Sequence, residues 1–134
     1  MSTQIAVDVI QTGPSASEAT VRTHTITMDR PEAKGGENRG PMGGEVLLMG
    51  LGGCFMSNLL AAIAARGADV KNVRFAIRGA LESAPPRFSA VSLRISADYA
   101  DKEEMRKLIT IAERGCIVRN TLKEALALTI ELDA

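Results

Sequence analysis

Residues 36–54 read GENRGPMGGEVLLMGLGGC, a glycine-rich stretch that continues into an apolar one. The opening part is rich in glycine, a composition that allows close backbone approach to another group or local mobility. From Val46 to Ala65 the chain then runs for twenty residues without a charge. This pattern predicts a long helix over residues 43–66, with Gly67 as its C-terminal stop.

The uncharged run is long enough to cross a bilayer, so the sequence must be asked whether this helix lies in a membrane or in a protein core. Small and polar residues dilute its hydrophobicity, namely Gly50, Gly52, Gly53, Ser57 and Asn58. The rest of the chain reads as amphipathic strands that need a helix to cover them. We therefore expect a buried core helix and no membrane association, with small residues that let another helix approach closely.

The segments around this helix read as strands. Residues 3–10 predict a short strand, and the β-branched residues of 18–28 predict a second strand that could be bent. Residues 70–81 and 88–99 alternate apolar and polar side chains, as does the final segment 126–132. Alternation with a period of two indicates sheet with one solvent-facing side.

Two helical segments lie between the last two of these strands. Asp101 is predicted to cap the first, and the second runs from Cys116 to about residue 125 after an interruption at Gly115. The apolar stripe of the first comprises Met105, Leu108, Ile109 and Ala112. The element order predicts one α+β domain over residues 1–134, with a helical layer against an antiparallel-rich sheet.

Composition narrows the function classes. Sixteen basic residues balance sixteen acidic ones, with no evident basic patch, which argues against nucleic-acid binding. The first residues carry no basic stretch followed by an apolar one, so we expect no signal peptide and a cytoplasmic protein. In a reducing cytosol, two cysteines are more typical of buried thiols or a redox pair than of a structural disulfide. His24 is the only histidine, so no zinc site is expected.

Cys54 and Cys116 are the candidate reactive residues. Cys54 lies mid-helix, beyond the first turn over which the helix dipole acts, so a reactive Cys54 needs a nearby cation, most naturally an arginine. Cys116 follows Gly115 and opens a helix, where free N–H groups and the dipole stabilise a thiolate. The alternative for each is a small core residue, and the sequence gives no Cα–Cα distance with which to test a disulfide.

Both cysteines lie in motifs that resemble those of the OsmC/Ohr family. Residues 36–54 resemble its signature of a glycine-rich loop, a Gly-Pro, an acidic residue opening a leucine-rich helix, and a Gly-Gly-Cys. Residues 112–122, AERGCIVRNTL, look like its second-cysteine motif. The resemblance covers roughly residues 18–132. It implies an OsmC-like α+β fold with a long central helix, in an intertwined homodimer with active sites near the dimer interface.

The resemblance also implies an activity. Cys54 would be the peroxidatic cysteine and Cys116 the resolving one, in a thiol peroxidase that reduces organic hydroperoxides. The implied cycle runs from a sulfenic acid at Cys54 to a disulfide with Cys116, which an external dithiol reduces by exchange. No metal and no bound cofactor are implied.

Two residues depart from the family pattern. Ile117 stands where a proline usually follows the second cysteine, a position that favours proline without requiring it. Glu45 lies nine residues before Cys54, whereas ten is typical of the well-characterised peroxidase branches. Nine residues of regular helix place two side chains on opposite faces, so a network of Glu45, an arginine and Cys54 would need an irregular helix start. The alternative for Glu45 is stabilisation of the helix N-terminus, and the pattern is nearer a less characterised branch.

The activating arginine is not fixed by the resemblance. Arg39 in the glycine-rich loop is our first candidate and Arg30 the second, with Arg22 further away in a predicted strand. The alternative for each is a solvated surface charge.

Two other functions remain open from the sequence. One is a binding module without turnover, holding a small hydrophobic molecule in a cleft lined by Met28, Met42, Met49 and Met56. The other is a thiol redox sensor, or a detoxifier of another electrophile. Slow peroxide turnover with reversible oxidation of the cysteine pair would favour the sensor.

Overall fold

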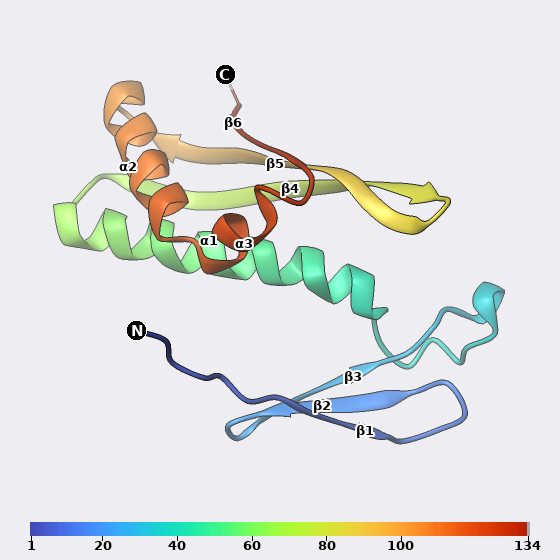
Figure 1. Ribbon diagram of the computed structural model, residues 1–134. Helices are drawn as coiled ribbons and strands as arrows, with labels where there is room; N and C mark the ends of the chain where they lie inside the picture. Colours follow the sequence, from blue (N-terminus) through green and yellow to red (C-terminus); the bar gives the residue numbers. More distant parts are fainter. Residues whose placement is uncertain (134) are drawn as a thin grey trace. The chain divides into compact units, whose positions relative to one another are not determined.

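The computed structural model describes residues 1–133 and divides into two compact units, with the boundary after Leu47 (Figure 1). The first unit contains β1 (Asp8–Gln11), β2 (Ser17–Val21), β3 (His24–Met28) and the 3-10 helix η1 (Glu32–Lys34). The second contains most of α1 (Gly43–Arg66), then β4 (Val70–Ser83), β5 (Pro86–Tyr99), α2 (Lys102–Gly115), α3 (Ile117–Leu122) and β6 (Ala127–Leu132). The single domain over residues 1–134 stays a prediction.

The first unit is a three-stranded antiparallel sheet in the order β1-β2-β3. The strand predicted over residues 18–28 is two strands, because the chain reverses at Arg22 and Thr23 to form a hairpin. Arg22 takes a φ of 55°, a left-handed conformation that tight hairpin turns usually give to Asn, Asp or Gly. The usual turn signal is therefore missing from the sequence. The strand predicted over residues 3–10 begins only at Asp8.

The glycine-rich segment between β3 and α1 is ordered by one buried carboxylate. Asp29 is only 4% exposed, and its Oδ1 accepts the Ser15 hydroxyl at 2.7 Å. The same carboxylate accepts three backbone N–H groups, those of Arg30 (2.7 Å), Glu37 (3.2 Å) and Arg39 (3.3 Å). The hydrogen bond from Ser15 is the largest cause that lowers the pKa of Asp29, and the backbone donors lower it further against the effect of burial. The segment is thus built around an ionised Asp29.

The long helix has the predicted bounds, Gly43–Arg66, and Gly67 ends it in a left-handed conformation with a φ of 58°. One face packs into the core through Leu51, Phe55, Leu59 and Ala62. By length and composition α1 could cross a membrane, but in this fold its buried face belongs to the core. Met49 and Leu60 on its other faces are 61% and 50% exposed, so the helix is buried on one side only.

The second sheet has the order β4-β5-β6. The β4–β5 hairpin is antiparallel, as predicted, whereas β6 runs parallel to β5, with Ala90 opposite Ala127 and Ile95 opposite Leu132. A parallel pair needs a crossover, and α2 and α3 supply it. The side chain of Asp101 caps α2 by accepting the backbone N–H groups of Glu103 and Glu104, as the sequence predicts.

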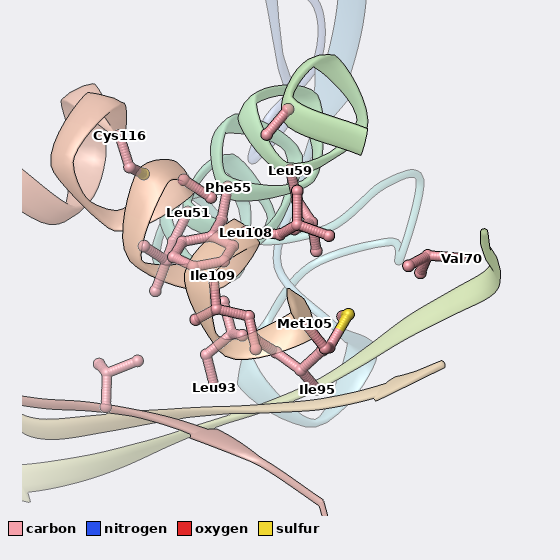
Figure 2. Close-up of a cluster of buried hydrophobic side chains, with 13 residues drawn as sticks. Leu51, Phe55, Leu59, Val70, Leu93, Ile95, Met105, Leu108, Ile109 and Cys116 are labelled. Carbon is pink, nitrogen blue, oxygen red and sulfur yellow. The ribbon is translucent and has the colours of Figure 1, made fainter. Parts of the chain in front are cut away.

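The core of the second unit lies between this sheet and two helices. Figure 2 shows β5 side chains meeting those of α1 and α2. Every residue of the predicted α2 stripe is buried. The core is largely aliphatic, and its aromatic part includes the edge-to-face pair of Phe55 and Phe75, whose ring centroids lie 5.6 Å apart. The chain is therefore α+β with two sheets and one long helix.

Candidate active site

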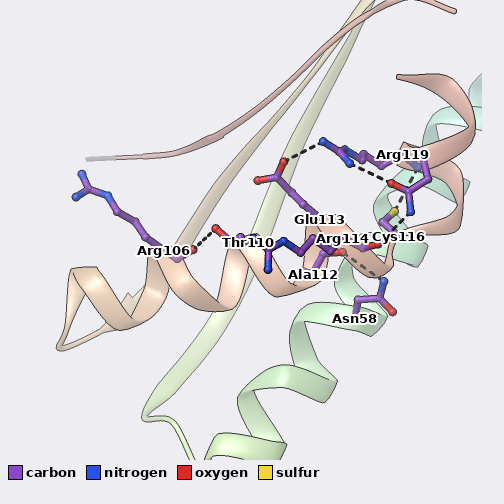
Figure 3. Close-up of polar contacts among 9 residues, drawn as sticks. Asn58, Arg106, Thr110, Ala112, Glu113, Arg114, Cys116 and Arg119 are labelled. Atoms are coloured by element: carbon purple, nitrogen blue, oxygen red, sulfur yellow. Dashed lines mark hydrogen bonds and ion pairs between the residues drawn. The ribbon is translucent and has the colours of Figure 1, made fainter. Parts of the chain in front are cut away.

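Cys116 lies at the junction between α2 and α3 and is fully buried. Its backbone is extended, with φ −78° and ψ 109°, which ends α2 and turns the chain into α3. Its Sγ accepts a hydrogen bond from the backbone N–H of Arg119 at 3.4 Å (Figure 3). Cys116 is thus the N-cap of α3 rather than its first residue, and α3 ends at Leu122, earlier than the predicted residue 125.

Cys54 lies on α1, half-buried, and its thiol is a neighbour of the Cys116 thiol. Both cysteines are free. They come from α1 and from the turn that follows α2, two elements brought together by the core of the second unit. The fold therefore places the two cysteines beside each other, which the sequence alone could not establish.

The surroundings of the pair make Cys116 a poor acid. Burial raises the pKa of the Cys116 thiol most, and the hydrogen bond and charge of Cys54 raise it further. The backbone N–H groups of Arg119 and Val118 act in the opposite direction. The N–H groups expected at this helix start are present, but burial outweighs them, so the prediction of a stabilised Cys116 thiolate is wrong. Cys116 is a protonated thiol at neutral pH.

An arginine close to this pair was missed in the sequence. Arg119 gives its backbone N–H to Cys116, and its guanidinium lies 3.6 Å from a carboxylate oxygen of Glu113. Another guanidinium nitrogen donates to the Asn120 side chain at 3.0 Å. Arg119 could have been found from its spacing, because an N-cap side chain accepts the N–H group two or three residues further on.

The other predicted site residues belong to the first unit. Arg39 is exposed, and its guanidinium donates to the carbonyl of Thr12 at 3.3 Å. Glu45 lies in the first turn of α1 and accepts the backbone N–H of Met42 at 2.8 Å. That contact is half of a capping box, the helix-stabilising alternative for Glu45. Arg30 is exposed beside the buried Asp29. Catalytic roles for Arg39, Arg30 and Glu45 stay predictions.

A cavity of 470 Å³ in the first unit contains two of the four methionines considered above, Met28 and Met42. Its remaining lining is largely polar and includes Ser15, Ser17, Asp29, Arg30 and Lys34. It is therefore less apolar than the predicted methionine cleft. His24 is exposed on β3, and no group of three or more metal-ligating side chains lies together in residues 1–133.

The sequence of residues 35–131 matches the family described as OsmC-like protein. The chain belongs to the OsmC-like protein family. The match includes Cys54, Cys116 and most of the second unit, so it covers the elements that bring the two thiols together. No curated protein matches the chain by sequence.

Solved structures share the fold of this OsmC-like protein. The OsmC-like protein from Mycoplasma pneumoniae gives a TM-score of 0.86 at 18% identity, over 99% of this chain and 98% of that one. An OsmC-like protein of unknown function from Vibrio cholerae gives 0.81 at 13% identity, over 98% and 100%. An organic hydroperoxide resistance protein from Elizabethkingia anophelis gives 0.76 at 17% identity, over 99% of each chain. Identities this low show the fold alone.

Proposed function

We propose that this OsmC-like protein is a cytoplasmic thiol peroxidase that reduces organic hydroperoxides through Cys54 and Cys116. The observation that carries the proposal is the unequal thiol pair, with a half-buried Cys54 beside a fully buried Cys116 whose pKa is raised. A peroxidatic thiol has to be reached by substrate, whereas a resolving thiol has only to reach its neighbour. The exposure of each cysteine fits the role that we propose for it.

The proposed cycle has three steps. In the first, the thiolate of Cys54 attacks the terminal oxygen of the hydroperoxide, an S–O bond forms and the O–O bond breaks. The departing alkoxide takes up a proton and leaves as the alcohol. In the second, the sulfur of Cys116 loses its proton and attacks the sulfenic sulfur of Cys54, so that an S–S bond forms and water leaves. In the third, an external dithiol reduces the disulfide by two exchanges and is itself oxidised.

Charge stabilisation of the attacking thiolate is part of the proposal. Arg39 is our first candidate for this role and Arg30 the second. Both belong to the segment ordered by Asp29, which accepts the backbone N–H of each. A fixed backbone reduces the conformational freedom that an arginine has to lose when it binds a charged group. We also propose an intertwined homodimer, as the family resemblance implies.

The test is peroxide consumption by reduced protein with excess cumene hydroperoxide and a dithiol. Wild type should consume peroxide rapidly, and Cys54→Ser should not exceed the rate without protein. In an assay without dithiol, Cys116→Ser should still consume one equivalent of peroxide, because Cys54 keeps its first step. Peroxide loss by wild type no faster than by Cys54→Ser would remove the assignment for this substrate class.

The same pair also supports a thiol redox sensor. The specific observation is the raised pKa of buried Cys116, since a protonated thiol attacks slowly and prolongs the life of the oxidised Cys54. Reversible formation of the disulfide at low peroxide, without sustained turnover, would favour the sensor over the enzyme.

A further inference from the structure

The last turn of α2 leaves a carbonyl without its helical partner. In a continuing helix the backbone N–H of Cys116 would bond to the carbonyl of Ala112, four residues earlier. It bonds instead to the carbonyl of Glu113 at 3.3 Å, because the chain turns at Cys116. Ala112 is fully buried, so its carbonyl cannot rely on bulk water and needs another donor.

Asn58 of α1 supplies that donor. Its Nδ2 donates to the Ala112 carbonyl at 3.4 Å, and Figure 3 shows the contact joining α1 to the end of α2. The contact is also close-packed on one side, since a Cβ atom added to Gly115 would lie 3.1 Å from Asn58 Nδ2. A larger residue at Gly115 would therefore require the Asn58 amide to shift by a few tenths of an ångström.

A second asparagine holds the same turn from its other side. Asn120 of α3 donates through Nδ2 to the carbonyl of Arg114 at 3.0 Å. The turn that carries Cys116 is thus tied to α1 by Asn58 and to α3 by Asn120. Of these two asparagines, only Asn58 connects the turn to the helix that bears Cys54.

The position of Asn58 on α1 gives this contact a consequence for the thiols. Asn58 lies four residues after Cys54, so the two side chains share one face of the helix. A disulfide needs an S–S bond of about 2.05 Å and Cα atoms within a narrow range. A shift of the turn that takes the Cα atoms outside this range would keep the two sulfurs from bonding. The Asn58 bond resists such a shift one helical turn away from Cys54.

We propose that Asn58 is a positioning residue that holds the α2–α3 turn at the separation from α1 at which Cys54 and Cys116 form their disulfide. This role rests on the proposed function, because the Cys54–Cys116 disulfide is part of that proposal. Asn58 acts only on the step in which the Cys116 sulfur displaces hydroxide from the sulfenic sulfur of Cys54, and water leaves. The attack of Cys54 on peroxide does not depend on it.

The first experiment contains no peroxide. Wild type, Asn58→Leu and Asn58→Ser are equilibrated with mixtures of reduced and oxidised dithiothreitol, and the Cys54–Cys116 disulfide is quantified by mass spectrometry. Without this bond the reduced turn samples positions at which the two sulfurs do not meet, so closing the disulfide costs more. An effect the size of one net hydrogen bond would lower its equilibrium constant by about two- to tenfold in both variants. Asn58→Gln keeps an amide donor and should recover part of the loss. Ser57→Leu, an exposed position on the same helix, is the matched control and should behave as wild type.

The second experiment separates the two chemical steps. After a pulse of cumene hydroperoxide, the sulfenic acid is trapped with a dimedone reagent and the disulfide is measured in parallel. Asn58→Leu should form the sulfenic acid at the wild-type rate but close the disulfide more slowly, so the trapped adduct accumulates.

The outcomes distinguish the two proposals. A dithiol equilibrium in Asn58→Leu and Asn58→Ser equal to that of Ser57→Leu would overturn the role of Asn58, whatever peroxide does. A wild type that forms no sulfenic acid would overturn the peroxidase, while the dithiol equilibrium would still decide on Asn58. Should Asn58→Leu melt well below wild type, Asn58→Ser, which adds no bulk, carries the comparison.

Discussion

The Sγ atom of Cys116 accepts the backbone N–H of Arg119 at 3.4 Å, so the cysteine that we propose closes the disulfide also caps α3. Helix caps are usually Ser, Thr, Asp or Asn, because their oxygens are strong acceptors. Thiol sulfur is a weak one. Rotation of the Cys116 side chain therefore changes a helix cap and a sulfur–sulfur contact at the same time.

The cap predicts different stabilities for two substitutions that both remove the thiol. Cys116→Ser keeps an acceptor for the Arg119 N–H, whereas Cys116→Ala leaves that group without one. We expect the free energy of unfolding of Cys116→Ala to lie below that of Cys116→Ser by about 0.5–2 kcal/mol. Urea unfolding under reducing conditions measures the difference. Equal values for the two variants would show that the cap contributes nothing to stability.

The raised pKa of Cys116 predicts how the stability of the reduced protein depends on pH. The folded state holds the Cys116 proton to a higher pH than the unfolded chain, whose thiol pKa is about 8.5. In the window above that value the folded state binds more protons, so the free energy of unfolding falls as pH rises. Below the unfolded thiol pKa, Cys116 adds no pH dependence to the free energy of unfolding.

This dependence can be assigned with one variant. The free energy of unfolding is measured with urea in a phosphine reductant at pH 7 and at pH 9.5. It should fall between the two pH values in wild type and fall less in Cys116→Ser, because a serine does not titrate in this range. A loss of the same size in both proteins would assign the effect to other groups.

Local signals in the sequence predicted the end of α1 and the start of α2. Asp101 was predicted to cap α2 and Gly67 to end α1, and both do so, because capping depends on residues close in sequence. The hairpin at Arg22 was missed, since the chain there adopts a left-handed turn without the residues that usually mark one. The parallel pairing of β5 with β6 was also missed, because alternation within a strand says nothing about its direction relative to a neighbour.

The candidate site was only partly predictable for the same reason. Residue types and spacing indicated Cys54 and Cys116, but only the packing of α2 on α1 shows that they are neighbours. The pKa of Cys116 was misjudged because the helix start is a local feature and burial is not. Asp29 and Asn58 act through bonds to residues distant in sequence, and no local pattern singles them out.

The arginine proposed to stabilise the Cys54 thiolate can be located by substitution. Hydrogen bonds to charged groups contribute about 1.5–3 kcal/mol, so loss of the activating arginine should slow peroxide attack about ten- to hundredfold. We expect this for Arg39→Ala and a smaller effect for Arg30→Ala. Arg87→Ala, an exposed arginine of the second unit, is the control. Single-turnover formation of the sulfenic acid is the measurement.

Arg39→Lys and the comparison with Arg30→Ala test whether Arg39 is the activating arginine. Arg39→Lys keeps the charge but loses the planar fork of donors, and it should fall between wild type and Arg39→Ala. If Arg39→Ala reacts with peroxide at the rate of Arg87→Ala while Arg30→Ala is slow, the role belongs to Arg30. Wild-type rates in both would exclude this segment as the source of the activating charge.

The carboxylate of Asp29 orders the segment that carries both arginines. Asp29→Asn keeps the shape of the side chain but replaces an ionised acceptor of four hydrogen bonds by a neutral one with a single acceptor oxygen. The segment should open more often, and limited trypsin digestion should cut faster after Lys34 and Arg39. Cleavage after Lys123, in an exposed turn of the second unit, should not change.

Acid should have the same effect on wild type. The pKa of Asp29 is lowered in the folded state, so its contribution to stability is present above the ordinary aspartate pKa of about 3.9 and is lost as pH falls through the lower folded value. Amide hydrogen exchange of residues 30–39 at decreasing pH measures this loss, after correction for the intrinsic rates. Asp29→Asn should lack the dependence, because it has no carboxylate at this position to protonate. If wild type and Asp29→Asn are protected equally over this range, the charge of Asp29 does not order the segment, and the positions of Arg30 and Arg39 must be fixed by other contacts.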